Sequence, residues 1–140
     1  MAETAWIVQG VDSALGVRLA PPQRWLRHGQ CTSYWIGPQQ WLITNPQAED
    51  YEAQRDKVIA AGGALFDVSH ARSAFRTSGE SLAKGCGLDF HPKAFAPGEC
   101  RSTLLARVAV LIARENTGFL VLAPRSYAES LRAWLALDPA

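Results

Sequence analysis

The same pattern occurs twice in this chain, and this repetition constrains the fold more than any other feature. An apolar run leads into a proline at residues 41–46 (WLITNP), and again, 78 positions later, at residues 119–124 (FLVLAP). Before each run lie another strand-like segment and then a turn. After each run comes a segment that begins with residues typical of a helix start. The separation is far too long for a solenoid repeat. The pattern therefore predicts an internal duplication of a strand–turn–strand–helix unit.

The first copy begins with a predicted hairpin. Residues 32–36 and 41–44 have the aromatic and β-branched side chains typical of strands, and Gly37-Pro38 marks the turn between them. Asn45-Pro46 then resembles a helix cap followed by a first-turn proline, and the acids Glu49, Asp50 and Glu52 suit the positive end of a helix dipole. Gly62-Gly63 predicts the end of that helix.

The second copy has stronger apolar character. Residues 108–113 form a continuous apolar run, a turn follows at residues 115–118, and residues 119–122 return as a strand. Ser126 and Glu129 fit a capping box. One face of the predicted helix holds residues spaced at i, i+4, i+7 and i+8, namely Tyr127, Leu131, Trp134 and Leu135.

The stretch between the two copies completes the predicted fold. Strands are expected at residues 64–68 and 72–77, with a short helix over residues 80–85 opened by Thr77 and Glu80. The sequence predicts an α+β fold in which both copies share one mostly antiparallel sheet, with the helices on one side.

Residues 1–30 differ in character from the remainder. They contain many Gly and Pro residues and one short strand candidate at residues 17–19, so we interpret them as an irregular N-terminal arm preceding an α+β domain at residues 31–140. Within the arm, Arg24, Trp25, Leu26 and Arg27 are candidates for a partner interface, because Trp and Arg dominate binding hot spots. The alternative is that Trp25 is simply a large core residue.

Composition excludes several classes of function. A chain of 140 residues with 48% apolar content builds one folded domain, and a net charge of +1 does not suggest nucleic-acid binding. No apolar run approaches the ~20 residues of a membrane-spanning helix. The N-terminal residues show no signal-peptide core, and three cysteines suit reduced thiols, so a cytoplasmic location is expected.

The search for catalytic, metal and cofactor residues is negative. Asp67, Ser69 and His70 are the residue types of a hydrolase triad. On a strand, residues at i and i+3 point to opposite faces, so Asp67 and His70 diverge and we expect a structural role. Cys86, His91 and Cys100 have irregular spacing, which is weak support for zinc. No phosphate-binding glycine motif is present. We therefore expect no catalytic, cofactor-binding or metal-binding residue in this chain.

Several motifs resemble the folate-binding fold of the aminomethyltransferase family. The stretch Phe66-Asp67-Val68-Ser69-His70 matches the motif that opens that fold, Gly79 and Leu82 match its short helix, and Asp89 matches the segment that follows. The resemblance implies that active members place an acid near the pterin on the turn between the next two strands. Residues 105–113 contain no Asp, Glu or Gly and are interpreted as buried strand, so that acid is missing here.

Within this superfamily the chain most resembles the gamma subunits of heterotetrameric sarcosine oxidases. The resemblance implies a non-catalytic assembly subunit with alpha, beta and delta partners, the main contact being with alpha. It implies that FAD, FMN, NAD, zinc and tetrahydrofolate are bound by the partners. It also implies that the complex demethylates sarcosine to glycine, transfers the one-carbon unit to tetrahydrofolate and forms hydrogen peroxide.

Two other hypotheses remain open on the sequence. One is a free-standing folate-fold binding protein in one-carbon metabolism, and the other is a truncated transferase with its own activity. The missing acid and the short length disfavour both.

Overall fold

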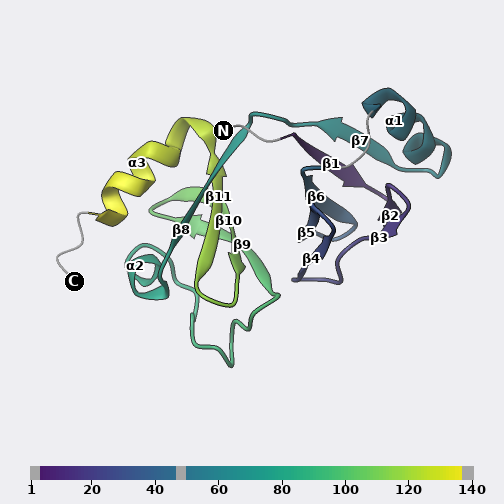
Figure 1. The fold of residues 1–140 in the computed structure, drawn as a ribbon. Coiled ribbons are helices and arrows are strands. Elements are labelled where there is room, and N and C mark those ends of the chain that lie inside the picture. Colours follow the sequence, from purple (N-terminus) through teal and green to yellow (C-terminus); the bar gives the residue numbers. More distant parts are fainter. Residues whose placement is uncertain (1–3, 47–49, 137–140) are drawn as a thin grey trace. The chain divides into compact units, whose positions relative to one another are not determined.

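A computed structural model describes residues 4–46 and 50–136 of the chain (Figure 1). The chain divides into two compact units, residues 1–70 and residues 71–140. This division lies 40 residues beyond the boundary expected at residue 30, because residues 1–30 belong to the same compact unit as residues 31–70.

The first unit contains an antiparallel sheet of five strands in the order β4-β5-β6-β1-β7. A separate two-stranded ribbon pairs β2 with β3, and one helix, α1, precedes β7. The elements are β1 (Ala5–Gln9), β2 (Ser13–Ala14), β3 (Val17–Arg18), β4 (Trp25–His28), β5 (Cys31–Gly37), β6 (Gln40–Thr44), α1 (Tyr51–Ala60) and β7 (Ala64–Asp67).

The predicted hairpin of the first copy is confirmed. β5 and β6 pair antiparallel across a tight turn, and a bulge between Trp35 and Gly37 interrupts the register. Gln39 in the turn has a positive φ of 58°. The aromatic and β-branched residues therefore form the strands that their propensities indicate.

The interpretation of residues 1–30 as an irregular arm is wrong. β1 lies inside the five-stranded sheet, where it pairs with β6 on one side and β7 on the other. Trp6 and Val8 on β1 are buried on one face, as a period of two requires. Residues 25–28, expected to be irregular, also form a strand, because β5 supplies the hydrogen-bonding partner. The pairing of β1 has no local signal in the sequence, whereas the two-residue loop Gly29-Gln30, with Gly29 at a φ of 63°, is a local signal for the β4–β5 hairpin.

α1 begins later than predicted and ends where predicted. Asp50 is the N-cap, and its carboxylate accepts a hydrogen bond of 3.0 Å from the backbone N–H of Glu52. Asn45, the expected cap, has a φ of 51° and donates its side-chain amide to the Gln30 carbonyl at 3.1 Å. Gly62, at a φ of 94°, ends the helix as expected. Glu49 lies outside the described residues.

The core of the first unit includes strand residues of its sheet, residues from the segment 11–20, and Val58 of α1. Val58 of α1 joins strand residues from every part of the sheet except β4. Trp41 is anchored within this core by a hydrogen bond of 2.7 Å from its indole N–H to the Ala20 carbonyl. The buried cluster contains Trp6, Val8, Leu19, Ala20, Cys31, Trp41, Ile43, Val58 and Leu65.

The second unit contains an antiparallel sheet of four strands in the order β8-β11-β10-β9, together with two helices. The elements are β8 (Arg72–Thr77), α2 (Gly79–Ala83), β9 (Cys100–Leu105), β10 (Val108–Arg114), β11 (Phe119–Pro124) and α3 (Arg125–Ala136). The strands predicted at residues 72–77, 108–113 and 119–122 are confirmed, whereas β9 was not predicted.

Three helix details in the second unit differ from expectation. The hydroxyl of Ser78, rather than Thr77, caps α2 by accepting a bond of 3.3 Å from the Ser81 N–H. α3 begins at Arg125, so Ser126 lies inside the helix and no capping box forms there. The buried face of α3 consists of Ala128, Leu131 and Leu135. Tyr127 and Trp134, expected on that face, are 52% and 41% exposed.

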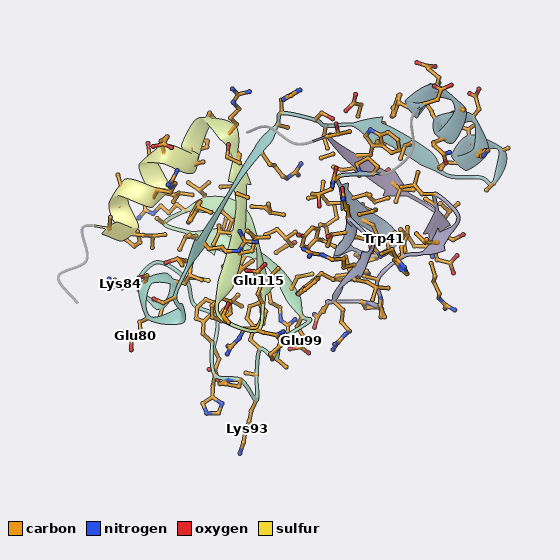
Figure 2. The ribbon with its side chains drawn as sticks, viewed as in Figure 1. Trp41, Glu80, Lys84, Lys93, Glu99 and Glu115 are labelled. Carbon is orange, nitrogen blue, oxygen red and sulfur yellow. The ribbon has the colours of Figure 1, made fainter. Side chains whose placement is uncertain are left out.

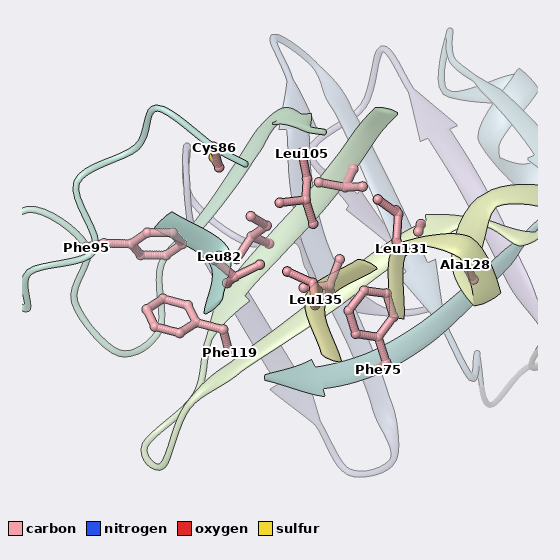
Figure 3. Packing of buried hydrophobic residues seen from close by; sticks show 13 residues of the cluster. Phe75, Leu82, Cys86, Phe95, Leu105, Phe119, Ala128, Leu131 and Leu135 are labelled. Atoms are coloured by element: carbon pink, nitrogen blue, oxygen red, sulfur yellow. The ribbon is translucent and has the colours of Figure 1, made fainter. Parts of the chain in front are cut away.

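Both helices of the second unit cover one face of its sheet. Leu82 of α2 and the buried residues of α3 belong to the same apolar cluster as the strand residues (Figure 3). Figure 3 labels Phe75, Leu82, Cys86, Phe95, Leu105, Phe119, Ala128, Leu131 and Leu135 of this cluster.

The predicted α+β class with antiparallel strands is confirmed. Each unit contains one strand–turn–strand–helix series, β5–β6–α1 and β10–β11–α3. The prediction of one shared sheet is wrong, because the two series belong to separate sheets. In the part of the chain that the structure describes, no helix combines the length and apolarity needed to cross a bilayer.

Candidate functional site

The four candidate interface residues lie together on the edge strand β4 and the residue before it. Trp25 is opposite Tyr34 of β5, and Leu26 is opposite Ser33. The Arg24 carbonyl accepts a hydrogen bond of 3.1 Å from the Trp35 N–H, so the pairing begins one residue before the strand. Arg24, Leu26 and Arg27 are exposed, whereas Trp25 is half-buried.

A turn directs the chain into this edge strand. The N–H of Arg24 donates to the Pro21 carbonyl at 3.1 Å, and Gln23 has a positive φ of 61°. Because side chains alternate along a strand, Trp25 and Arg27 share one face of the sheet and Leu26 lies on the other. The structure therefore brings the predicted residues together as an exposed, ordered strand.

The segment at residues 67–70 forms a turn stabilised by its own side chains. The Asp67 carboxylate accepts the Ser69 N–H at 3.0 Å, and the Ser69 Oγ accepts the Ala5 N–H at 3.0 Å. Ser69 thus has a structural role, but its hydroxyl bonds the backbone of Ala5 in β1, 64 residues away in the sequence. His70 has a positive φ of 69° in the turn.

Hydrogen bonding at this turn lowers the pKa of Asp67. The Ser69 hydroxyl makes the largest contribution and the Ser69 backbone N–H the next, each favouring the charged carboxylate. Slight desolvation opposes them, and the charge of nearby His70 adds a smaller lowering of the pKa. The lowered pKa keeps the Asp67 carboxylate ionised, which suits its role as a hydrogen-bond acceptor in the turn. It does not suit a group that must take up and release a proton.

The turn between β9 and β10 is the place where the aminomethyltransferase resemblance implies an acid. Its two central residues are Ala106 and Arg107, with φ values of 48° and 70°. The interpretation as buried strand holds for Leu105 but is wrong for Ala106 and Arg107, because these two residues reverse the chain. The sequence contains no Gly or Asn at this point that would indicate a two-residue turn.

The three cysteines and His91 do not form a cluster. Cys31, Cys86 and Cys100 are all free and buried, and burial raises the pKa of the Cys31 thiol. The Nδ1 of His91 accepts the Lys93 N–H at 3.1 Å, so it stabilises a loop. Among residues 4–46 and 50–136, no group of three or more His, Cys, Asp or Glu residues lies close enough to hold a metal ion.

Two arginines that sequence reasoning missed hold the loop between α2 and β9 to the sheet. Arg114 donates to the carbonyls of Phe90 and Phe95 at 3.2 and 3.5 Å, and its guanidinium lies 4.7 Å from the centre of the Phe119 ring. Arg101 lies 4.9 Å from the centre of the Phe95 ring.

The far end of the same loop points outward. Lys93 extends away from the sheet at the tip of the loop (Figure 2). The loop is therefore fixed at its base by the two arginines and presents its tip to the surroundings.

Comparison with known proteins gives consistent results. A family model described as the sarcosine oxidase gamma-subunit family matches residues 1–140. Sarcosine oxidase subunit gamma of Corynebacterium sp. (strain P-1) is 33% identical over 109 residues, which covers 72% of this chain and 53% of that protein. The chain thus spans about half the length of this curated relative.

The solved structures include a similar chain. The heterotetrameric sarcosine oxidase from Corynebacterium sp. U-96 in complex with pyrrole 2-carboxylate matches with a TM-score of 0.76 and 25% sequence identity. The match covers 95% of this chain and 77% of that one. The family model spans the whole sequence, and this chain therefore belongs to the sarcosine oxidase gamma-subunit family.

Proposed function

We propose that this chain is a non-catalytic gamma-type subunit of a heterotetrameric, flavin-dependent sarcosine oxidase and acts in its assembly and stability. The observation that carries the proposal is the family match over residues 1–140. The similarity to a chain of a heterotetrameric sarcosine oxidase over 95% of this sequence supports it.

In this proposal the chemistry belongs to the partner subunits. The complex oxidises the N-methyl group of sarcosine, releases glycine and hydrogen peroxide, and transfers the one-carbon unit to tetrahydrofolate. Alpha, beta and delta subunits bind FAD, FMN, NAD, zinc and tetrahydrofolate in the cytoplasm, and alpha makes the main contact with this chain.

Two local structures support a non-catalytic role. The triad-like residues Asp67 and Ser69 are engaged with backbone groups of their own turn and of β1. The turn between β9 and β10 presents Arg107, a cation, where the aminomethyltransferase resemblance implies an acid. At the first place the side chains are held in structural hydrogen bonds, and at the second the acid is replaced by a cation.

The experiment is affinity purification of the tagged chain from its native host, followed by gel electrophoresis and an absorbance spectrum. We expect co-elution with two larger chains and one smaller chain, with flavin absorbance. A colourless 15 kDa chain that elutes alone would overturn the proposal. Titration with tetrahydrofolate would then test the alternative of a free-standing folate-fold protein.

Within the complex, we propose that Arg24, Trp25, Leu26 and Arg27 contact a partner subunit. The exposure of Arg24, Leu26 and Arg27, and the position of residues 24–27 on the edge strand or directly before it, support this role. Replacing Arg24, Trp25 and Arg27 together with Ala should weaken assembly by about 2 kcal/mol or more, because buried Trp and Arg anchors contribute this much to interfaces. Unchanged assembly of the triple variant would contradict this assignment.

A further inference from the structure

The charges of the first unit are unevenly distributed. Between Asp12 and Glu49 the sequence has no Asp or Glu, yet it contains several basic residues. β5 and β6 carry no charged side chain at all, so Arg27 and His28 on β4 carry the basic groups of these three strands. Arg24 directly precedes β4, and all three side chains are exposed. The edge of this sheet is therefore basic without a neighbouring acid on β4–β6.

At Arg27, the backbone hydrogen-bonding groups of β4 point away from β5. The Trp35 N–H bonds to the Arg24 carbonyl, so residues 24, 26 and 28 face β5 in the alternating pattern of an antiparallel pair. The N–H and C=O of Arg27 then point to the opposite side. As far as the described residues extend, β4 is the last strand of the sheet on that side.

We propose that an acidic, extended segment of a partner subunit docks along β4 as an additional strand. The inference rests on the proposed function and specifies how the partner is bound. Backbone bonds to Arg27 supply the pairing, as in other cases of strand addition. The Arg27 guanidinium group attracts the carboxylates of the segment and selects it by charge complementarity.

An exposed basic edge can also serve only to prevent sheets from joining edge to edge. The composition of β4 favours docking over simple protection, because Trp25 and Leu26 place apolar surface in the same short strand as Arg27. Leu26 is 37% exposed. Apolar residues on a strand edge would work against a purely protective role, whereas Trp flanked by Arg is typical of binding anchors.

The test uses the complete complex reconstituted with the other subunits, and measures the affinity of this chain at low and high salt. Three variants separate the contributions: Arg27→Glu reverses the charge, Arg27→Ala removes it, and Arg27→Pro also removes the outward N–H. Proline is tolerated here because an edge position does not break the ladder to β5. Arg55→Glu, an exposed charge reversal on α1, is the matched control.

We expect Arg27→Glu to weaken binding by about tenfold or more, with a larger effect at low salt, because the attraction becomes repulsion. Arg27→Pro should bind more weakly than Arg27→Ala, and Arg55→Glu should bind like the wild type. Equal affinities of the Pro and Ala variants would overturn strand addition. If Arg27→Glu binds like the wild type, the proposal that the docked segment is acidic is wrong.

These outcomes are distinct from a failure of the proposed function. If the wild-type chain does not join the complex, the proposed function is overturned and the docking inference with it. If the wild type joins and the variants join equally well, only the docking inference is overturned. Increased self-association of Arg27→Glu without loss of partner binding would establish a protective edge instead.

Discussion

The ring of Trp134 lies directly over Gly85 in the second unit. A Cβ added to Gly85 would lie 2.7 Å from Cη2 and 2.9 Å from Cζ3 of that ring. The Gly85 carbonyl also accepts a hydrogen bond of 2.9 Å from the Ala106 N–H. One residue thus links the end of α2, the turn between β9 and β10, and the exposed side of α3.

This contact predicts that Gly85→Ala destabilises the chain. The added methyl group displaces the Trp134 ring, and overpacking of this kind costs about 1–3 kcal/mol. In a Trp134→Ala background the same change should cost clearly less, because only the close approach of the added Cβ to the Ala106 nitrogen, at 3.2 Å, then remains. Urea denaturation of the four proteins measures the effect, and an equal cost in both backgrounds would contradict the contact.

Arg107→Gly should stabilise the hairpin of β9 and β10. Arg107 has a φ of 70°, a conformation that costs roughly 1–2 kcal/mol for a residue with a side chain. Glycine adopts it freely, so the free energy of unfolding should rise by about 1 kcal/mol. Ala109→Gly, an exposed strand position nearby, is the control and should lower it. A fall in stability on Arg107→Gly would mean that the arginine side chain makes a contact that outweighs the turn strain.

Arg114→Ala should release the loop between α2 and β9. The substitution removes hydrogen bonds to the carbonyls of Phe90 and Phe95 and the stacking on Phe119. Hydrogen bonds from a charged donor contribute about 1.5–3 kcal/mol, so a loss near 2 kcal/mol is expected. Hydrogen exchange should quicken in residues 88–98, and the exposed control Arg132→Ala should leave it unchanged. Uniform acceleration throughout the second unit would instead indicate global unfolding.

Ser69→Ala should raise the pKa of Asp67 toward its ordinary value, because the Ser69 hydroxyl is the main cause of the lowering. A carboxylate with a lowered pKa in the folded state adds stability above its unfolded pKa, and this stability is lost as the pH falls through the folded pKa. The Ser69→Ala variant should therefore lose less stability on acidification. Carbon-13 NMR titration of Asp67 checks the shift, with Ser13→Ala as control. An unchanged Asp67 titration in Ser69→Ala would assign the lowering to the backbone N–H alone.

The candidate interface shows how far sequence reasoning extends. The exposure of Arg24 and Arg27 was predictable from their charge and from the nearby prolines, whereas Trp25 is half-buried. Their strand conformation was missed because the prolines before them indicated irregular chain, although the two-residue loop Gly29-Gln30 is a local signal for their hairpin with β5. Their role in binding a partner stays a prediction.

Local patterns in the sequence alone determined the β5–β6 hairpin, the strand β8, the β10–β11 pair and the stop at Gly62, since nearby residues supply their propensities and turns. Only the tertiary structure decided the rest. β1 acquires its place because β6 and β7, whose paired residues are 31 to 61 positions away, pair with it. The two sheets are separate because long-range hydrogen bonding, which has no local pattern, selects which strands meet. Ala106 and Arg107 reverse the chain because β9 and β10 pair on either side of them, and that pairing outweighs the cost of their backbone conformation.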